Sequence, residues 1–281
     1  FDFPQPEELS PPIVNIENAS VGYEEKTVLS DINLRIDQDD RIAILGQNGE
    51  GKSTLSKLIA NKLKPHVGKI IHSNKLRIGY FAQHQLDELT LNETPMDHVH
   101  RERPSEKQGQ IRARLDGFGI SVDQADTRVK SLSGGQKARL SLLLASLDAP
   151  HLLILDEPTN HLDIESREAL VEALTKYSGA VIIVSHDIHL LSLVADRLWL
   201  AKNGTVKPYQ YDLDTYRKSL LSISSSKKPE QLKNPKTVRK SYTKDEIIVL
   251  KNNVKKSEER IEKLLMMEEK ISQKLADPKI Y

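Results

Sequence analysis

A glycine-rich turn early in the chain carries the residue types that bind phosphate. Residues 46–53 read GQNGEGKS and match the pattern G-x-x-x-x-G-K-[S/T], in which backbone N–H groups cradle phosphate oxygens. A β-branched segment, 41–45, precedes the turn, and a helical pattern, 54–60, follows it, so that a helix N-terminus adds its positive end. This context predicts that Lys52 neutralises charge on the β- and γ-phosphates and that Ser53 binds Mg²⁺.

Further residues of the turn are expected to surround the same phosphates, although a glycine-rich turn with a purely structural role is the alternative. Glu50 is a poor match, because a carboxylate near a triphosphate is repelled by it; we therefore expect its side chain to point outward. The expected nucleotide-contacting residues, besides Lys52 and Ser53, are Gly46, Gln47, Asn48, Gly49, Glu50, Gly51 and Thr54.

Two carboxylates stand directly after an apolar segment in the second half of the chain. Residues 152–155 read LLIL and are followed by Asp156 and Glu157. The C-terminal end of a parallel strand faces the ligand crevice of its sheet. The pattern therefore predicts that Asp156 holds Mg²⁺ through its waters and that Glu157 polarises the attacking water as general base.

A histidine follows the next apolar segment at the corresponding place. His186 comes shortly after 181–184, so it is expected at the same sheet edge, where it can contact the γ-phosphate. The alternative is an ordinary polar histidine with satisfied hydrogen bonds.

The segment LSGGQ, residues 132–136, stands just before a helical pattern that starts at Lys137. A serine and two glycines at a helix N-terminus favour an anion-binding nest. The same residues also suit a helix N-cap with a turn, and the pattern alone leaves both interpretations open.

The elements that position these residues alternate in type along residues 12–220. Segments 13–16, 41–45, 152–155 and 181–184 are predicted strands, and the last three are apolar runs, as is typical of strands buried in a parallel sheet. Helical patterns cover 137–147 and 166–177. The layout predicts an α/β fold with a mainly parallel sheet. Residues 1–11, with three prolines and a fourth directly after them at Pro12, are expected to form an extended lead-in.

The C-terminal part differs in composition. Residues 222–281 hold 15 Lys/Arg and 9 Asp/Glu, and the stretch 221–243 is rich in serine, proline and basic residues, which predicts a flexible linker. Such a linker either binds nucleic acid through phosphates or is simply solvated. Residues 244–281 show a heptad pattern with Ile247, Val254 and Ile261 on one seam, which predicts a coiled-coil helix. Such a helix is marginally stable alone in water, so we expect it to pack against an antiparallel second arm, another chain, or a ribosomal or RNA surface. The alternative is a helix that docks on the main domain.

Composition excludes several classes of protein. The 281 residues carry a formal net charge of +1, with 38% hydrophobic and 29% charged residues, as expected of a soluble globular protein. No apolar run approaches the roughly 20 residues that span a bilayer, so no integral membrane segment is expected. There is no cysteine, and therefore no disulfide, thiolate metal site or cysteine nucleophile. No secretory signal is visible at the N-terminus, and a cytoplasmic location is expected.

Taken together, these motifs resemble those of the ATP-binding cassette (ABC) ATPases. The phosphate-binding turn, Gln83 within 79-GYFAQH-84, the LSGGQ segment, the Asp156–Glu157 pair and His186 occur in the order of that superfamily, over about residues 12–220. The resemblance implies a P-loop NTPase cassette, in which the mainly parallel sheet is accompanied by a helical subdomain and an antiparallel β part.

A longer segment narrows the resemblance to one branch of the superfamily. Residues 156–163, DEPTNHLD, are similar to the hallmark of ABC-F proteins, which are soluble, paired-cassette ATPases that act on the ribosome; the similarity continues near 209–216. The chain looks most like the second, C-terminal cassette of such a protein with the first arm of a C-terminal coiled-coil extension.

The resemblance also assigns roles that the residues alone do not. It implies that Tyr23 stacks on adenine, although a core aromatic is the alternative, and that Gln83 contacts Mg²⁺ and the lytic water. Asp163 is implied in communication across a pair of cassettes. The signature residues implied to grip the γ-phosphate of ATP held by the opposite cassette are Ser133, Gly134 and Gly135, with Gln136 beside them.

These roles imply partners as well as ligands. ATP and Mg²⁺ are the expected cofactors, and each complete site needs a second cassette, because this chain contains one phosphate-binding turn and one LSGGQ segment. The expected function is ATP binding and hydrolysis by a cassette that acts on the ribosome. The alternative is the ATP-binding subunit of a membrane transporter with a permease partner. A chromosome- or repair-type ATPase is disfavoured, because those proteins separate the two motifs by a long insertion.

Overall fold

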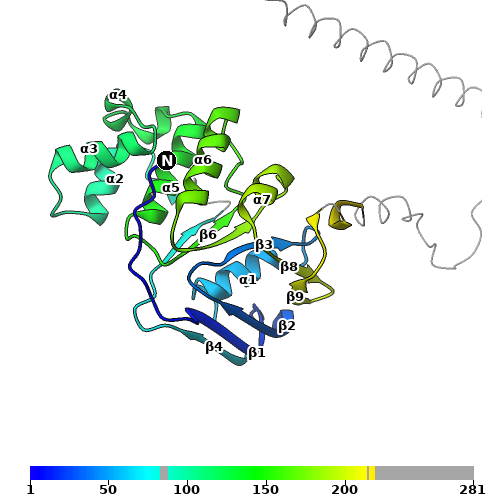
Figure 1. Cartoon of the computed structure of the whole chain (residues 1–281). Coiled ribbons are helices and arrows are strands. Elements are labelled where there is room, and N and C mark those ends of the chain that lie inside the picture. The colour runs from blue at the N-terminus through cyan, green and yellow to red at the C-terminus, as the bar shows by residue number, and fades with distance from the viewer. Residues whose placement is uncertain (83–87, 214, 219–281) are drawn as a thin grey trace, which may run out of the picture. The chain divides into compact units, whose positions relative to one another are not determined.

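We describe the protein from a computed structural model, which describes residues 1–82, 88–213 and 215–218 (Figure 1). The predicted linker 221–243, the predicted coiled-coil helix 244–281 and Gln83 lie outside the described residues.

A mainly parallel sheet forms the centre of the described chain. Its strand order is β5-β6-β7-β3-β8-β9, all neighbours being parallel except the antiparallel pair β8 and β9. The most apolar strands, β3, β6 and β7, are adjacent and almost fully buried, because helices and the second sheet cover them. The bounds are β3 (Arg41–Leu45), β5 (Ile78–Phe81), β6 (Leu152–Asp156), β7 (Ala180–Val184), β8 (Arg197–Lys202) and β9 (Thr205–Tyr209).

A second, antiparallel sheet has the order β2-β1-β4 and comprises β1 (Val14–Tyr23), β2 (Lys26–Ile36) and β4 (Val67–His72). Its inward face shares one apolar cluster with the central sheet and with helix α1 (Lys52–Ile59). Leu55, Leu58 and Ile59 of α1 are fully buried in that cluster, so the helix that starts at the phosphate-binding turn is anchored between the two sheets.

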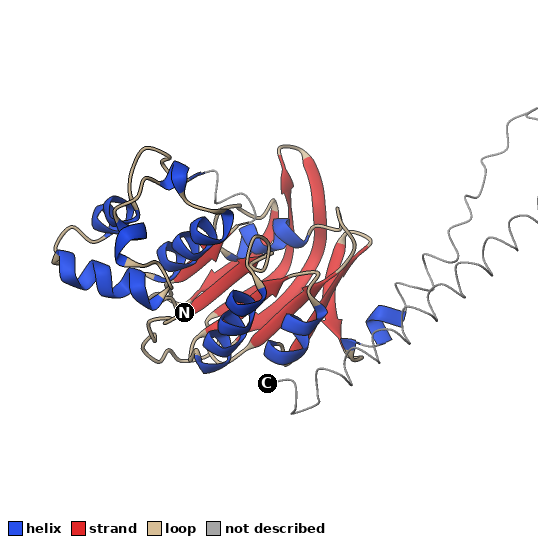
Figure 2. Ribbon diagram, turned by 90° about the horizontal axis from the view of Figure 1, so that it is seen from above, coloured by secondary structure: helices blue, strands red, loops and turns tan. Residues whose placement is uncertain are grey.

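Apart from α1, the helices lie away from the antiparallel sheet (Figure 1), and a view from above shows most helices beside the strands (Figure 2). They pack around a second apolar cluster that includes residues of β6 and β7. The bounds are α2 (Pro95–Glu102), α3 (Gln108–Gly117), α4 (Val122–Ala125), a 3₁₀ turn (Val129–Ser131), α5 (Gly134–Ser146), α6 (Ile164–Lys176) and α7 (Ile188–Val194).

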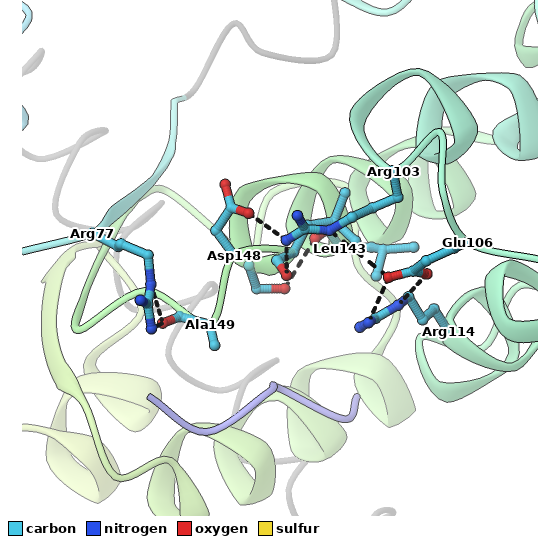
Figure 3. A network of polar contacts seen from close by, with 9 residues as sticks. Arg77, Arg103, Glu106, Arg114, Leu143, Asp148 and Ala149 are labelled. Atoms are coloured by element: carbon cyan, nitrogen blue, oxygen red, sulfur yellow. Dashed lines mark hydrogen bonds and ion pairs between the residues drawn. The ribbon is translucent and has the colours of Figure 1, made fainter. Parts of the chain in front are cut away.

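Two arginines hold the connection between α2 and α3, and one of them, Arg103, also binds the end of α5 (Figure 3). Arg103 donates to the carbonyl of Leu147 at 2.8 Å and also binds the carboxylate of Asp148. Arg114 grips Glu106 with two hydrogen bonds of 2.9 Å each. Because the last carbonyls of a helix lack partners within it, the contact of Arg103 with Leu147 stabilises the C-terminal end of α5.

The lead-in packs against the C-terminal ends of α3 and α6. The ring of Phe3 is 3% exposed and meets the ring of Phe118 edge-on, with centroids 5.4 Å apart, and that of Tyr177 at 5.9 Å. Phe1 also meets Phe118 edge-on, at 5.6 Å. The described residues 1–10 contain neither helix nor strand. An aromatic pair therefore anchors this segment.

The prediction of an α/β fold with a mainly parallel sheet is confirmed, with differences at the ends of elements. The predicted strand 41–45 coincides with β3, whereas the predicted strand 13–16 extends as β1 to Tyr23. Helices α1, α5 and α6 begin two or three residues before the predicted starts. Their starts are set by cap residues, Gly51, Ser133 and Asp163, which the apolar periodicity does not reveal.

Candidate functional site

The carboxyl ends of β3, β6 and β7 open into a cleft of about 590 Å³, where most of the predicted site residues meet. This is the edge at which parallel α/β sheets bind ligands. The residues that line it are Tyr23, Val28, Asn48, Gly49, Gly51, Lys52, Ser53, Thr54, Asp156, Glu157, Asn160, Val184 and His186.

The turn at the base of the cleft depends on glycine. Gly51 has a φ of +90°, in the left-handed region, and a Cβ placed there would lie 2.7 Å from Cδ2 of Leu29. Gly51 is also the N-cap residue of α1, whose first turn holds no acidic side chain. The free N–H groups and the positive end of α1 therefore face the cleft without a competing carboxylate in that turn.

Lys52 is the cation of the cleft. Its side chain is only 9% exposed, and Nζ donates to the carbonyls of Gly46 at 2.8 Å and of Gln47 at 3.1 Å. Burial lowers the pKa of Lys52, and the carboxylates of Glu157, Asp156 and Glu50 counteract part of that shift. The ammonium is thus held over the turn by neutral carbonyls, in a position from which it can attract phosphate oxygens.

Two carboxylates face this cation from the end of β6. Asp156 is 4% exposed, and Glu157 follows it with a backbone N–H that donates to the carbonyl of Val184 at 2.7 Å. Burial raises the pKa of Glu157, while the charges of His186 and Lys52 lower it in part. A carboxylate with a raised proton affinity is a better general base than an exposed one.

The backbone of Glu157 is strained. Its φ is +55°, a left-handed value that non-glycine residues rarely adopt. Such strain collects at functional sites, where the surrounding structure holds a side chain in a required direction. Here it lets the chain turn sharply after β6 with the carboxylate still in the cleft.

His186 lies on the rim of the cleft and links both carboxylate and turn. Its Nε2 is 3.1 Å from Oδ1 of Asn48 and 3.7 Å from Oε1 of Glu157. The hydrogen bond requires a proton on Nε2, because the amide oxygen of Asn48 only accepts. Sequence reasoning placed His186 at this edge but did not foresee its pairing with Asn48.

Tyr23, at the end of β1, also lines the cleft. Its side chain is 43% exposed, and Nζ of Lys57 lies 5.4 Å from the ring centroid. An aromatic face that is open to a phosphate-binding cleft is available for stacking on a planar base.

Glu50 points away from the phosphate-binding cleft. Its Oε2 accepts a hydrogen bond of 2.8 Å from the N–H of Asn203, in the turn between β8 and β9, and Glu50 does not line the cleft. The side chain therefore connects the turn to a neighbouring hairpin.

The LSGGQ segment forms the start of α5 and does not line this cleft. Oγ of Ser133 accepts from the N–H of Gln136 at 3.2 Å, and Oε1 of Gln136 accepts from the N–H of Ser133 at 2.8 Å, which is a capping box. Gly134 and Gly135 both lie close to His161, since a Cβ added at each glycine would come within 3.5 Å and 3.1 Å of it, respectively. Of the two interpretations, an anion-binding nest and a helix N-cap, the structure of the single chain shows the N-cap.

Asp163 caps the next helix. Its Oδ1 accepts from the N–H of Ser166 at 2.8 Å, and the bonds to Ser166 lower the pKa of Asp163. Arg139 of α5 lies 3.7 Å from the same carboxylate and donates to Oγ of Ser166. The LSGGQ helix and the segment 156–163 are therefore connected by polar contacts.

The donor set in the cleft suits Mg²⁺ that is bound together with phosphate. No group of three or more His, Cys, Asp or Glu side chains gathers as a metal site within the ranges that the structure describes. Ser53 and Asp156 instead supply a hydroxyl and a carboxylate beside the turn. Mg²⁺ prefers few protein oxygens complemented by substrate phosphate and water, so these residues match the ion.

Known proteins with similar sequences are ATP-binding proteins of the ABC type. The sequence model of the ABC transporter family matches residues 29–160. The chain is 41% identical over 251 residues to "Probable ATP-binding protein YheS" of Escherichia coli K12, covering 88% of this chain and 39% of that protein. It is 41% identical to "ABC transporter F family member 4" of Arabidopsis thaliana, covering 78% and 32% of the respective chains. The chain thus spans well under half the length of these relatives.

Solved structures share the architecture. A dimeric ATP-binding cassette in a post-hydrolysis state, bound to ADP and Pi, superposes with a TM-score of 0.60 at 25% identity, covering 70% of this chain and 97% of that one. Within the residues described here, no helix has both the length and the apolar character to cross a bilayer.

Proposed function

The chain belongs to the ABC-F family of ATP-binding cassette ATPases, and from this membership we propose that it binds and hydrolyses ATP as one half of a pair of cassettes. The observation that carries the proposal is the convergence of Lys52, Glu157 and His186 on one cleft at the start of α1. A lysine that neutralises phosphate charge and a residue that positions or deprotonates the attacking water recur in sites of phosphoryl transfer, and Lys52 and Glu157, the latter with a raised pKa, match these two parts.

In this proposal the residues of the cleft have separate roles in binding adenine, phosphate and Mg²⁺. Tyr23 stacks on adenine, and the N–H groups of the turn together with Lys52 hold the phosphates. Ser53 and Asp156 hold Mg²⁺, which neutralises phosphate charge when bound; Gln83, by resemblance, belongs to the same set.

Glu157 carries the proton transfer. As the oxygen of the attacking water bonds to the γ-phosphorus and the bond to the β–γ bridging oxygen breaks, the water passes a proton to Glu157. His186, 3.7 Å from Glu157 in this structure, contacts the γ-phosphate and orients the carboxylate.

We place the signature half of each site on the partner cassette. Ser133, Gly134 and Gly135 are outside the cleft of their own chain, which supports a role toward ATP held by another cassette. The related cassette whose solved structure is dimeric supports the same arrangement. In the full-length protein the pair closes on ATP, and we propose that the closed form binds the ribosome in the cytoplasm. The relatives of the F family and the segment 156–163 support this over a transporter subunit.

Co-sedimentation tests the proposal. The full-length protein carrying Glu157→Gln should pellet with ribosomes when ATP and Mg²⁺ are present, because slow hydrolysis prolongs the closed form. The same variant with ADP, and a Lys52→Ala/Glu157→Gln double variant with ATP, should stay in the supernatant. Equal pelleting in all three samples, or recovery of the protein with a membrane permease, would contradict a ribosomal role.

A further inference from the structure

A tyrosine from the far end of the described chain reaches the phosphate-binding turn. Tyr216 lies after β9, and its side chain is 7% exposed, with its ring 6.0 Å from that of Tyr209. The segment is fixed by Asp212, whose Oδ1 accepts from the N–H of Thr215 at 2.7 Å and whose carbonyl accepts from the N–H of Tyr216 at 3.1 Å. The ring therefore enters the core from a residue whose N–H is hydrogen-bonded to Asp212.

The phenol contacts the first residue of the turn. The N–H of Gly46 donates to Oη of Tyr216 at 3.0 Å, across 170 positions of sequence. The carbonyl on the other side of the Gly46 Cα accepts from Nζ of Lys52 at 2.8 Å. One peptide of Gly46 is thus held by Tyr216 and the next by the phosphate-binding cation.

The backbone of Gly46 lies close to Ala201 on one side and is openly packed on another. Its φ is +148°, and a Cβ at this position would lie 2.6 Å from the carbonyl oxygen of Ala201. The side of the turn toward Tyr216 borders a cavity of about 340 Å³. Asn48, Lys52 and His186 line both this cavity and the nucleotide cleft. Because packing is open on that side, a polar contact carries more of the positioning there.

We propose that Tyr216 is a positioning residue of the phosphate-binding turn, which orients the Gly46 peptide and through it Lys52. This inference rests on the proposed function, because it concerns affinity for the phosphates of ATP. The proposal also couples the segment 209–218 to the turn, so that binding of ATP to the turn changes the stability of this segment. Coupling of this kind is reciprocal, so ATP on the turn must stabilise the segment as much as the segment stabilises the ATP-bound turn.

The test compares Tyr216→Phe with the wild-type 281-residue chain. The variant keeps the ring and removes only the hydroxyl. The Kd for ATP with Mg²⁺, measured by calorimetry, should rise about 2- to 12-fold, as expected for one hydrogen bond. Turnover at saturating ATP should stay within about twofold, because the carboxylate is untouched. Tyr211→Phe is the matched control: Tyr211 is 67% exposed, its ring lies 5.5 Å from that of Tyr209, and its Kd should not change.

Hydrogen exchange provides two further readouts, one without nucleotide and one with ATP. Exchange at the N–H of Gly46 should be faster in Tyr216→Phe than in the wild type, and ATP should slow exchange in 209–218 only when Tyr216 is present. A lower melting temperature with an unchanged Kd would show a purely structural tie and overturn the inference, as would unchanged exchange at Gly46. If the wild type failed to bind ATP, the proposed function would fall, and exchange at Gly46 would still decide whether Tyr216 holds the turn.

Discussion

The phosphate-binding turn and the LSGGQ segment lie in the same chain but differ in what their polar groups do. Around the turn, Lys52, Asp156, Glu157 and His186 come from separate places in the sequence and line one cleft. In the LSGGQ segment, the side chains of Ser133 and Gln136 hydrogen-bond within the segment and cap α5. The first region is assembled by the fold, whereas the second is a local structure with its glycines in the first turn of α5.

This difference teaches that the two motifs have different requirements. The cleft needs the whole sheet, because β3, β6 and β7 must meet at one edge. The LSGGQ segment forms its capping box within the start of its own helix, and its proposed role in phosphate binding would need ATP held by a second cassette. Substitutions in the cleft should therefore change ATP binding or the hydrolysis step, whereas substitutions in the LSGGQ segment should change only hydrolysis by paired cassettes.

Replacing the carboxylate at Glu157 should have the largest effect. Glu157→Gln should slow hydrolysis by roughly 10²- to 10⁴-fold and leave the Kd for ATP within a few-fold, because the amide cannot accept the proton of the water. Phosphate release under single-turnover conditions measures the rate. Glu165→Gln, on the exposed first turn of α6, is the control and should hydrolyse ATP as the wild type does. Normal turnover in Glu157→Gln would remove Glu157 from the role of base.

Removing the cation should act on binding instead. Lys52→Ala should raise the Kd for ATP by about 10- to 100-fold, since a hydrogen bond to a charged group is lost. Calorimetry with ATP and Mg²⁺ measures the change. Lys62→Ala is a matched loss of positive charge, because its ammonium lies over the ring of Tyr80, outside the cleft. Wild-type affinity in Lys52→Ala would contradict the assignment of the turn.

The acid side of the pH–rate profile should report Glu157. Burial raises the pKa of this carboxyl, so its proton is retained at a higher pH than in an exposed glutamate. Because the base must be ionised, turnover should fall about tenfold per pH unit below that pKa. Turnover at saturating ATP, followed in a series of buffers at constant ionic strength, measures it. The residual activity of Glu157→Gln should lack this limb; a limb of the same position in the variant would point to another group.

The smallest effect is expected at the LSGGQ segment. Ser133→Ala should leave the Kd for ATP unchanged and lower hydrolysis by the paired cassettes several-fold, while loss of the cap costs about 1 kcal/mol of stability. Ser121→Ala is the control, since Ser121 forms the same capping box with Gln124 at the start of α4. Equal losses of turnover in both variants would mean that Ser133 acts only as a helix cap.

The sequence predicts the parts of this molecule whose signals are local. The apolar runs of β3, β6 and β7 identify buried parallel strands, and the spacing of the glycines and Lys52 identifies the turn. β4 and β9 lack such a signal: β4 is largely exposed, and β9 contains Pro208, which is tolerated because β9 is the last strand of its sheet.

Contacts between distant residues are what the sequence does not reveal. Glu50 binds the N–H of Asn203 across 153 positions, and Tyr216 accepts from Gly46 across 170. Asn203 and Gly204, with φ values of +52° and +73°, form the turn between β8 and β9, and this dipeptide is a recognisable hairpin signal. Only the folded chain shows that this hairpin lies beside the phosphate-binding turn.

The left-handed backbone at Glu157 has a consequence for how such sequences drift. A φ of +55° costs a glutamate on the order of 1 kcal/mol, and asparagine tolerates that conformation better. Glu157→Asn would relieve this strain and also remove the cost of a carboxylate whose side chain is only 12% exposed. With Glu157 as the proposed base, selection for yield alone would favour the asparagine, and only selection for turnover would retain the acidic side chain.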